Sequence, residues 1–478
     1  MILFLVTAAS SYRLQRQVAR RLARTGASVG FLYERDEDAV FALIQKDAAD
    51  LGATAVALES LFETGRESGA VLRRHPRLYH AVALWFRAHL MKPGRVQSML
   101  RRLLPGGLFR RVVLLDADAE EIASLGALRS LLAARLDAAK RALTRFRPAI
   151  IVACEDGVSA PLPVHAVARH EAIPVVILPY GYGVRSDFDI VLEGKEARGE
   201  VMRAEGCWLR LLTRHAPQWV KQGAHAGALM HSGPYIVAAE SLGITLRDSW
   251  TVHGGYADRV YVESEQMRRV YLDEGLPQSK LVLTGTPYCD VMTDALGRNP
   301  DARAALRQPR RITPGLMRVL VSWPPSYHAD RGAFSEFATY REMTRATLGW
   351  LCSLASCQVT VSLHPATLPA DRSAVIDTGV SLATEYVVEL IPQHDLFVTY
   401  FSSTIRWAVA AGKPVVNFDL YRLGLQVYDA APGVITVSTL DDFKRAMMRL
   451  AASEDAFAET AARPKPHALR GGLRRLGG

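Results

Sequence analysis

Short apolar runs alternate with helical patterns along most of the chain, and this alternation limits the fold most strongly. ILFLVT at 2–7 is followed by a helical stretch that Ser10 or Ser11 can begin and Gly26 can end, and SVGFLYE is the next apolar run. A strand, a helix and a second strand in this order form a βαβ unit, whose strands are parallel. The chain is therefore predicted to be an α/β protein built on parallel sheets.

The rhythm occurs in two separate parts of the chain, which predicts two domains. At 478 residues the chain exceeds what one ordinary hydrophobic core holds. Residues 1–290 are predicted to form the first domain and 317–460 the second, which runs from MRVLVSW through QVTVSLHP, DLFVTYFSS, PVVNFD and GVITVS. A polar linker rich in Pro and Arg is expected at 291–316, and a basic flexible tail at 461–478.

A basic block interrupts the first domain at about 66–148. Its content of Leu, Ala and Arg predicts a mainly helical insertion. Between Arg66 and Arg111 there are eleven Lys or Arg residues and one acidic residue, Glu67, and the whole chain carries a formal net charge of +10. The block is either a solvated helical surface or a surface for anionic lipid or an acidic glycan acceptor. With the basic tail it predicts peripheral contact with an anionic membrane, whereas no nucleic-acid partner is expected.

Cysteine usage and hydropathy favour a reduced, cytoplasmic setting. The five cysteines are scattered and form no CxxC pair, so neither a zinc site nor a disulfide framework is expected. The apolar start MILFLVT is short and has no basic region before it, which favours a first strand over a signal peptide. No run reaches the roughly 18 apolar residues of a membrane span. The expected location is the cytoplasm, at most touching the inner face of the cytoplasmic membrane.

Two carboxylates and a glycine, Glu155, Asp156 and Gly157, follow the apolar run AIIVAC. Ligands of α/β folds bind at the carboxyl ends of strands. One of two adjacent carboxylates in a site can have a raised pKa, and a carboxylate near its working pKa suits a general base for an acceptor hydroxyl. Asp156 is the first candidate for this base and Glu155 the second. The plain alternative is an aspartate that caps an ordinary turn.

Three hydroxyl residues, Ser402, Ser403 and Thr404, follow DLFVTYF and begin the helical pattern IRWAVAAG. Free N–H groups and a partial positive charge let helix N-termini hold phosphate, and hydroxyls there can donate further hydrogen bonds. The three residues are therefore predicted to bind phosphate. The alternative is that one of them only caps the helix.

His364-Pro365 ends the apolar run VTVSL of the second domain. Proline disfavours helical geometry at the residue before it, so His364 is expected to be extended at the edge of the sheet. An imidazole placed there can hold a departing phosphate. Ser322, near the end of the domain's first strand, is expected at the same edge.

Further polar and glycine residues are candidates for the walls of the site. Tyr180 and Tyr182, in the string YGYG, are expected to line an acceptor cleft together with Gly157. Asp116-Ala117-Asp118 is a rival signal, because a DxD string can hold a metal that bridges a nucleotide diphosphate. The same string, DADAEE, also fits the acidic start of a helix. No metal is expected, and no cofactor other than a nucleotide-sugar donor.

These features together resemble the GT-B glycosyltransferases, which have two Rossmann-like, doubly wound domains. ADRVYVESEQMRRVYLDEGLPQSKLVLTGTPYCD is similar to the last βαβ of a GT-B first domain, and DLFVTYFSSTIRWAVAAGKPVVNFD to the donor-binding strand and helix of the second. The latter is also similar to UDP-N-acetylglucosamine 2-epimerases and CDP-glycerol glycerophosphotransferases.

The order of the three motifs narrows the resemblance. A D/E-D/E-G string, then His-Pro, then a Ser-Ser/Thr cluster resembles bacterial sialyltransferases and polysialyltransferases of GT-B type, and Kdo capsule transferases that also use CMP-sugars. The resemblance implies that Asp156 is the base. It also implies that His364-Pro365 and Ser402–Thr404 hold the CMP phosphate.

The expected function is inverting, metal-independent transfer of a sugar to a glycan or glycolipid in bacterial surface-polysaccharide synthesis, such as capsule or lipopolysaccharide. An acidic sugar from a CMP donor, such as sialic acid or Kdo, is the first expectation. A UDP-sugar transferase, a UDP-GlcNAc 2-epimerase or a polyol-phosphate transferase on the same scaffold remain alternatives. A non-catalytic protein that binds glycan or lipid is a further one.

Overall fold

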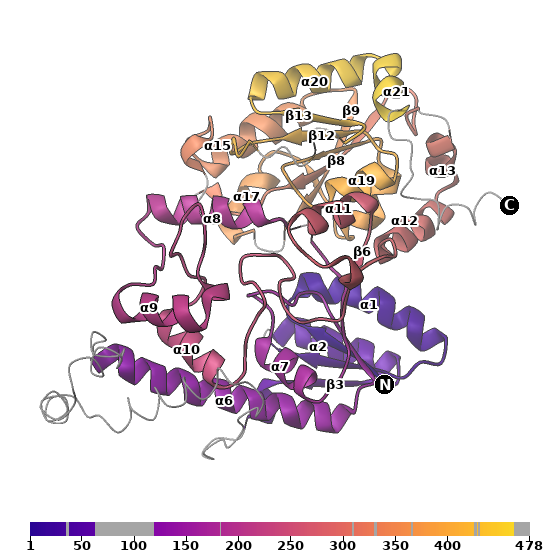
Figure 1. The fold of residues 1–478 in the computed structure, drawn as a ribbon. Coiled ribbons are helices and arrows are strands. Elements are labelled where there is room, and N and C mark those ends of the chain that lie inside the picture. The colour runs from indigo at the N-terminus through magenta and orange to yellow at the C-terminus, as the bar shows by residue number, and fades with distance from the viewer. Residues whose placement is uncertain are drawn as a thin grey trace, which may run out of the picture. The chain divides into compact units, whose positions relative to one another are not determined.

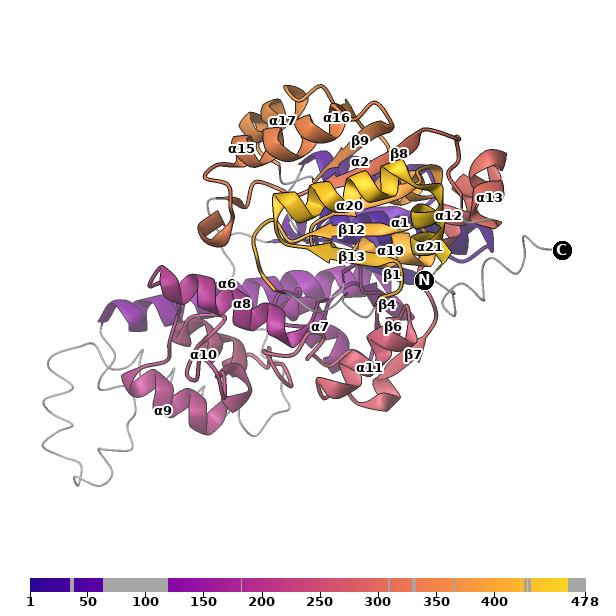
Figure 2. The ribbon, with the colours of Figure 1, turned by 90° about the horizontal axis from the view of Figure 1, so that it is seen from above.

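The computed structural model describes residues 1–34, 38–62, 119–181, 183–307, 310–328, 332–364, 367–424, 428 and 431–462. The chain divides into two compact units, unit 1 at Met1–Thr284 and unit 2 at Gly285–Gly478. The division lies slightly before position 290, where the first domain was expected to end. Each unit holds one sheet with helices on it (Figures 1 and 2).

Unit 1 contains a seven-stranded sheet in the order β3-β2-β1-β4-β5-β6-β7. All its strand pairings are parallel. The strands are β1 (Ile2–Val6), β2 (Val29–Tyr33), β3 (Thr54–Ala57), β4 (Ile150–Ala153), β5 (Val175–Ile177), β6 (Arg259–Val262) and β7 (Leu281–Leu283). The helices are α1 (Ala9–Arg24), α2 (Asp38–Asp50), α6 (Ala119–Phe146), α7 (Leu162–His170), α8 (Arg185–Ala197), α9 (Gly206–His215), α10 (Gly233–Ser241) and α11 (Glu265–Asp273), with short 3₁₀ turns at Glu59–Leu61, Pro217–Trp219 and Gln278–Lys280.

Alternate residues of these strands face opposite layers of helices. Leu3 and Leu5 of β1 belong to the core beneath α6, α7 and α10. Phe4 and Val6 belong to a second core, beneath α1 and α2. A strand that is apolar on both faces is typical of a parallel sheet covered on both sides. The predicted doubly wound sheet is therefore confirmed for unit 1.

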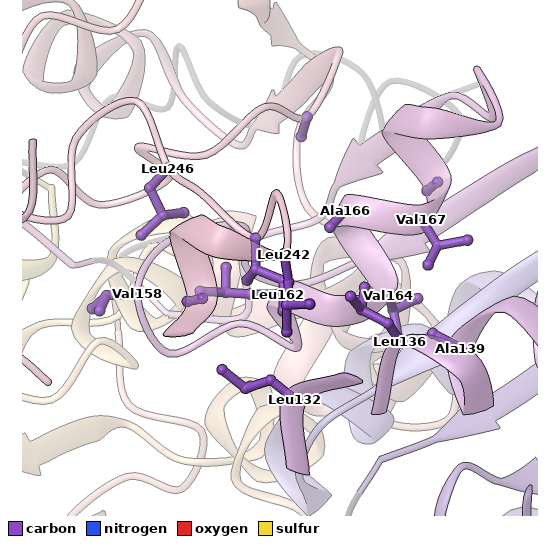
Figure 3. Close-up of a cluster of buried hydrophobic side chains, with 14 of the residues drawn as sticks. Leu132, Leu136, Ala139, Val158, Leu162, Val164, Ala166, Val167, Leu242 and Leu246 are labelled. Atoms are coloured by element: carbon purple, nitrogen blue, oxygen red, sulfur yellow. The ribbon is translucent and has the colours of Figure 1, made fainter. Parts of the chain in front are cut away.

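On the side of the sheet where the Glu155-Asp156-Gly157 turn lies, the helices pack around an apolar cluster. Leu132 and Leu136 of α6 meet Leu162 of α7 and Leu242 just after α10 (Figure 3). Val158, one residue beyond Glu155-Asp156-Gly157, joins the same cluster. The turn after β4 is thus anchored at its far end by hydrophobic burial.

Unit 2 contains a six-stranded sheet, also with all pairings parallel, in the order β10-β9-β8-β11-β12-β13. The strands are β8 (Met317–Trp323), β9 (Cys357–Leu363), β10 (Ser381–Leu382), β11 (Leu396–Thr399), β12 (Val415–Phe418) and β13 (Val434–Val437). The helices are α12 (Pro287–Gly297), α13 (Pro300–Arg307), α15 (Tyr340–Thr344), α16 (Trp350–Cys352), α17 (Pro369–Ile376), α18 (Val387–Leu390), α19 (Ile405–Ala410), α20 (Leu440–Ala452) and α21 (Glu454–Ala462). A π-helical turn at Arg345–Gly349 joins α15 to α16, and 3₁₀ turns lie at Gly332–Phe334 and Ile391–Gln393. The second doubly wound parallel sheet is confirmed as well.

The stretch 291–316, expected to be a linker, contains the end of α12 and all of α13. Thr286 caps α12 by accepting a hydrogen bond from the backbone N–H of Tyr288, and Pro287 occupies the first helical turn. Tyr288 then packs on Trp407 of α19, with ring centroids 4.2 Å apart. The helix is therefore part of unit 2, because burial of its aromatic face outweighs the polar composition that suggested a linker.

Most of the basic block falls outside the described residues. Its described end, α6, is helical as expected, whereas 63–118 and 463–478 are not described. Within the described ranges, every helix is too short or too polar to cross a membrane.

Candidate functional site

The carboxyl edge of the sheet in unit 1 brings three polar residues together around its switch point. Strands run outward from β1 to β3 in one direction and from β4 to β7 in the other, so the order reverses between β1 and β4. Ser10 follows β1, Glu155 follows β4 and Tyr180 follows β5. A crevice outside this reversal is the usual ligand position of open α/β sheets.

Glu155 is half-buried, and its carboxylate accepts a hydrogen bond from the Tyr180 phenol. Ser10 in turn hydrogen-bonds to the Tyr180 oxygen. Burial raises the pKa of Tyr180 well above its ordinary value, and the nearby Glu155 charge raises it further. The phenol therefore stays protonated and available as a donor, and Glu155 is held at the sheet edge.

Asp156 points elsewhere and is 1% exposed. Its Oδ2 accepts hydrogen bonds from Lys280 Nζ at 2.9 Å and from the backbone N–H of Ala257 at 2.9 Å. Ala257 and Lys280 precede β6 and β7, at the strand starts rather than at the strand ends. The two adjacent carboxylates thus lie in different surroundings, one at the carboxyl edge and one in a buried ion pair.

Two histidines complete the surroundings of Asp156. His253 Nδ1 lies 3.7 Å from Asp156 Oδ1, and the His253 side chain is buried. His165 of α7 donates to the backbone of Glu155. Burial lowers the pKa of each histidine to about 4, so both are neutral at neutral pH and Lys280 supplies the charge that balances Asp156.

The second group of candidates lies at the carboxyl edge of the sheet in unit 2. The strand order reverses between β8 and β11, and β9 lies on the other side of β8. Ser322 on β8 is in register with Thr399 on β11 and with Ser362 on β9. His364 follows β9 and is exposed, and the hydroxyl cluster 402–404 follows β11. The fold therefore places these candidates around one switch point, as the positions of the motifs predicted.

The hydroxyls of the cluster are bonded to one another. Ser402 Oγ accepts from Thr404 Oγ1 at 2.7 Å and from the Thr404 backbone N–H at 3.2 Å. Ser402 thus helps to close the turn before α19, whose N-cap residue, Thr404, makes no side-chain capping hydrogen bond, and all three residues stay half-exposed. Ser403 contributes its backbone oxygen to Arg406, at 2.9 Å.

Asn417, which is buried, holds the strained residue Phe401 just before the hydroxyl cluster 402–404. Phe401 has a φ of +30°, an unfavourable backbone region for a residue with a side chain. Its N–H donates to Asn417 Oδ1 at 2.8 Å, and Asn417 Nδ2 donates to Thr436 Oγ1 at 3.3 Å. Asn417 is fully buried on β12. Its side chain fixes the direction in which the hydroxyl cluster leaves the sheet.

Replacing Asn417 by Ala is expected to lower the free energy of unfolding of unit 2 by about 1–3 kcal/mol, because the Phe401 N–H loses its acceptor. Urea unfolding followed by tryptophan fluorescence measures the change. Thr436→Val is the matched control, since it removes only the outer bond at an exposed residue and is expected to cost less than about 1 kcal/mol. Equal midpoints for Asn417→Ala and the wild type would show that Asn417 does not support the turn.

Three of the predicted positions lie outside the described residues: Tyr182, Pro365 and the DxD string at 116–118.

Gly157 lies beside the backbone of His253. A Cβ added to Gly157 would lie 3.6 Å from the backbone nitrogen of His253. Among the described residues there is no group of three His, Cys, Asp or Glu side chains that could hold a metal ion.

Several residues that build the two edges were not identified from the sequence. Lys280 and Asn417 are separated from their partners along the chain and had no local motif. Ser10 was considered only as a helix cap. The string His253-Gly254-Gly255 was a detectable signal, because paired glycines after a polar residue indicate a tight approach of backbones.

No protein-family model matches the chain, and neither does any curated protein. Among solved structures, the chain is similar to UDP-GlcNAc 2-epimerase from Neisseria meningitidis bound to UDP-GlcNAc, with 11% identity and a TM-score of 0.49 over 100% of this chain and 98% of that one. It is similar to CalG4, the calicheamicin glycosyltransferase, with 13% identity and a TM-score of 0.47 over 99% and 95%. It is also similar to the glycosyltransferase SnogD from Streptomyces nogalater, with 13% identity and a TM-score of 0.41 over 100% and 99%. Likenesses of this degree carry no residue role over to this chain.

Proposed function

We propose that this protein is a GT-B-type, inverting, metal-independent glycosyltransferase that uses a nucleotide sugar. The observation that carries the proposal is the collection of polar groups at the switch point of each of its two sheets. Unit 1 offers a carboxylate there, Glu155, and unit 2 offers hydroxyls and an imidazole. A base for an acceptor and donors for a phosphate are the two sets of groups that such a transfer needs.

In unit 2, the leaving nucleotide is assigned to the edge formed by β9, β8 and β11. His364 and the hydroxyls of Ser402 and Ser403 donate hydrogen bonds to phosphate oxygens, Thr404 holds the Ser402 hydroxyl in place by donating to it, and Ser322 lies at the same edge. The support is their common position at one sheet edge and the exposure of His364. Charge that develops on the phosphate as it departs is stabilised by donors already fixed in place.

In unit 1, Glu155 is assigned as the general base in preference to Asp156. A base needs a carboxylate oxygen that an acceptor hydroxyl can reach, whereas Asp156 is buried and its Oδ2 holds Lys280 and Ala257. Glu155 takes the proton of the acceptor hydroxyl, whose oxygen attacks the anomeric carbon. The bond from that carbon to the nucleotide phosphate breaks, and its electron pair leaves with the phosphate. Tyr180 lines the acceptor side.

A nucleotide screen tests the proposal most directly. A ligand that binds only the folded protein raises its melting temperature by mass action. We expect CMP to stabilise the protein more than CDP, UDP or GDP. The expected reaction is then transfer of an acidic sugar from a CMP-linked donor to a glycan or glycolipid. Stabilisation by UDP alone would replace the CMP donor by a UDP-sugar, and stabilisation by none of the four would contradict nucleotide-sugar chemistry in favour of a non-catalytic glycan or lipid binder.

Product analysis separates the alternatives on the same scaffold. Incubation with UDP-GlcNAc and no acceptor yields a new sugar epimer only if the protein is a 2-epimerase. Transfer of a phosphate-bearing polyol from a CDP donor would identify a polyol-phosphate transferase. Either result would replace sugar transfer as the function.

Replacing His364 by Ala is expected to weaken binding of the nucleotide about tenfold or more, because a hydrogen bond to a charged phosphate is lost. Isothermal titration calorimetry with the stabilising nucleotide measures this change. His170→Ala is the matched control, since His170 is an exposed histidine at the end of α7. Unchanged affinity in His364→Ala would remove the imidazole from the phosphate site.

The proposed place of action is the cytoplasmic face of the membrane, where surface polysaccharides are assembled. The basic residues between 66 and 111 and those of the tail are the proposed contact with anionic lipid. Deletion of the tail is expected to reduce sedimentation with anionic vesicles.

A further inference from the structure

Asp156 and Lys280 join three segments of unit 1 that are distant in the sequence. Lys280 Nζ donates to Asp156 Oδ2 at 2.9 Å, to the backbone oxygen of His253 at 2.7 Å and to that of Gly255 at 3.2 Å. Asp156 Oδ2 also accepts from Ala257 N at 2.9 Å. The ammonium group therefore has three acceptors in fixed directions, and the carboxylate two donors.

The burial of this pair makes it costly to leave either charge alone. Asp156 is 1% and Lys280 6% exposed. An unpaired buried charge destabilises a protein strongly, whereas removing both charges together is often nearly neutral. This part of the core therefore tolerates the two charges together, but neither charge alone.

The pair fixes the turn on which Glu155 lies. The chain leaves β4 at Ala153, and Asp156 is tied three residues later to the starts of β6 and β7. Val158 is buried just beyond. With both ends of the turn held, Glu155 is directed to Tyr180 at the sheet edge, and Tyr180 also bonds to Ser10.

We propose that Asp156 is a positioning residue whose ion pair with Lys280 holds Glu155 in its working orientation. The inference rests on the proposed function, because it assigns the role of the second carboxylate in that site. Glu155 then meets the acceptor, and Asp156 fixes the turn.

Removing the charges singly and together separates positioning from catalysis. Asp156→Asn and Lys280→Gln each leave one buried charge unbalanced, and each is expected to lower the melting temperature by about 10 °C. Turnover per folded molecule is expected to fall about 10- to 100-fold, because Glu155 is displaced. In the double variant, Asn and Gln can hydrogen-bond without charge. Its melting temperature is expected to return to within a few degrees of the wild type, and its turnover to within about tenfold.

If Asp156 were the base, the second change at Lys280 could not restore activity. The double variant therefore decides whether Asp156 acts as the base or as a positioning residue. A double variant that regains the melting temperature but stays as inactive as Asp156→Asn would show that Asp156 is the base. A double variant that does not fold would contradict the pair as a unit that can be neutralised.

A second buried acid supplies the matched control. Asp47 of α2 is also 1% exposed and accepts from Tyr12 and Arg16. Asp47→Asn is expected to lower the melting temperature but to leave turnover per folded molecule within about twofold, and an equal loss of turnover there would show that instability alone explains the effect. The melting-temperature cycle needs no substrate. Wild-type protein without turnover on any nucleotide sugar would therefore refute the proposed function, while coupling between positions 156 and 280 would still be measured.

Discussion

Replacing Glu155 by Gln is expected to lower the rate of sugar transfer about 10²- to 10⁴-fold, the usual contribution of a general base. The amide has nearly the shape of the carboxylate and can still accept the hydrogen bond from Tyr180, so the turn after β4 keeps its position. It cannot take a proton from the acceptor hydroxyl. The affinity for the nucleotide is expected to be unchanged, because the nucleotide is assigned to unit 2.

Steady-state release of the free nucleotide, with donor and acceptor both saturating, measures this loss. Ser159→Ala is the matched control, since Ser159 is an exposed residue of the same turn outside the proposed site. Its turnover is expected to equal that of the wild type. Full turnover in Glu155→Gln would remove Glu155 from the role of base, and the Asp156 and Lys280 double variant would then identify whether Asp156 takes it.

The positions of the strands could be predicted because each buried strand is a continuous apolar run. MRVLVSW coincides with β8, and the runs that precede Glu155, His364 and Ser402 each end a strand at a sheet edge. Parallel strands align their carboxyl ends, so the motifs were expected to gather at those edges. This part of the site follows from local sequence alone.

The direction of each carboxylate could not be predicted from local sequence. Glu155 and Asp156 are neighbours, and the groups that surround the buried one come from far along the chain: Lys280 lies 124 positions away and Ala257 lies 101 positions away. The same holds for Phe401, whose strained backbone depends on an amide 16 positions later. Long-range hydrogen bonds of single side chains leave no periodic pattern, so a reading by strands and helices misses them.

The hydrogen bonds within the hydroxyl cluster are compatible with the phosphate binding proposed for it. Ser402 Oγ accepts from the Thr404 N–H and so closes the turn that precedes α19, whose N-cap residue is Thr404. Thr404 Oγ1 uses its proton on Ser402, which leaves the Ser402 hydroxyl proton directed away from this pair. Phosphate binding in unit 2 is thus proposed for hydroxyls whose positions the turn already fixes.

Replacing Gly255 by Ala is expected to abolish folding of unit 1, or to lower its free energy of unfolding by more than about 4 kcal/mol. A Cβ at this position would lie 1.9 Å from the backbone oxygen of Asp156 and 2.9 Å from its Oδ2. Neither backbone can move away, because Lys280 holds the oxygen of Gly255 and the carboxylate of Asp156 at once. The clash is therefore mainly with the backbone of Asp156, the residue whose ion pair is proposed to position Glu155.

Circular dichroism and urea unfolding of Gly255→Ala beside Gly194→Ala measure this effect. Gly194 lies within α8, where an added Cβ meets only the end of the Arg198 side chain at 3.7 Å. Ala is the better helix former there, so this control is expected to gain about 0.5–1 kcal/mol. Opposite signs at the two glycines are the expected result. A Gly255→Ala protein as stable as the wild type would mean that the backbones of 156 and 255 can separate, and the ion pair could then not be the element that fixes the turn.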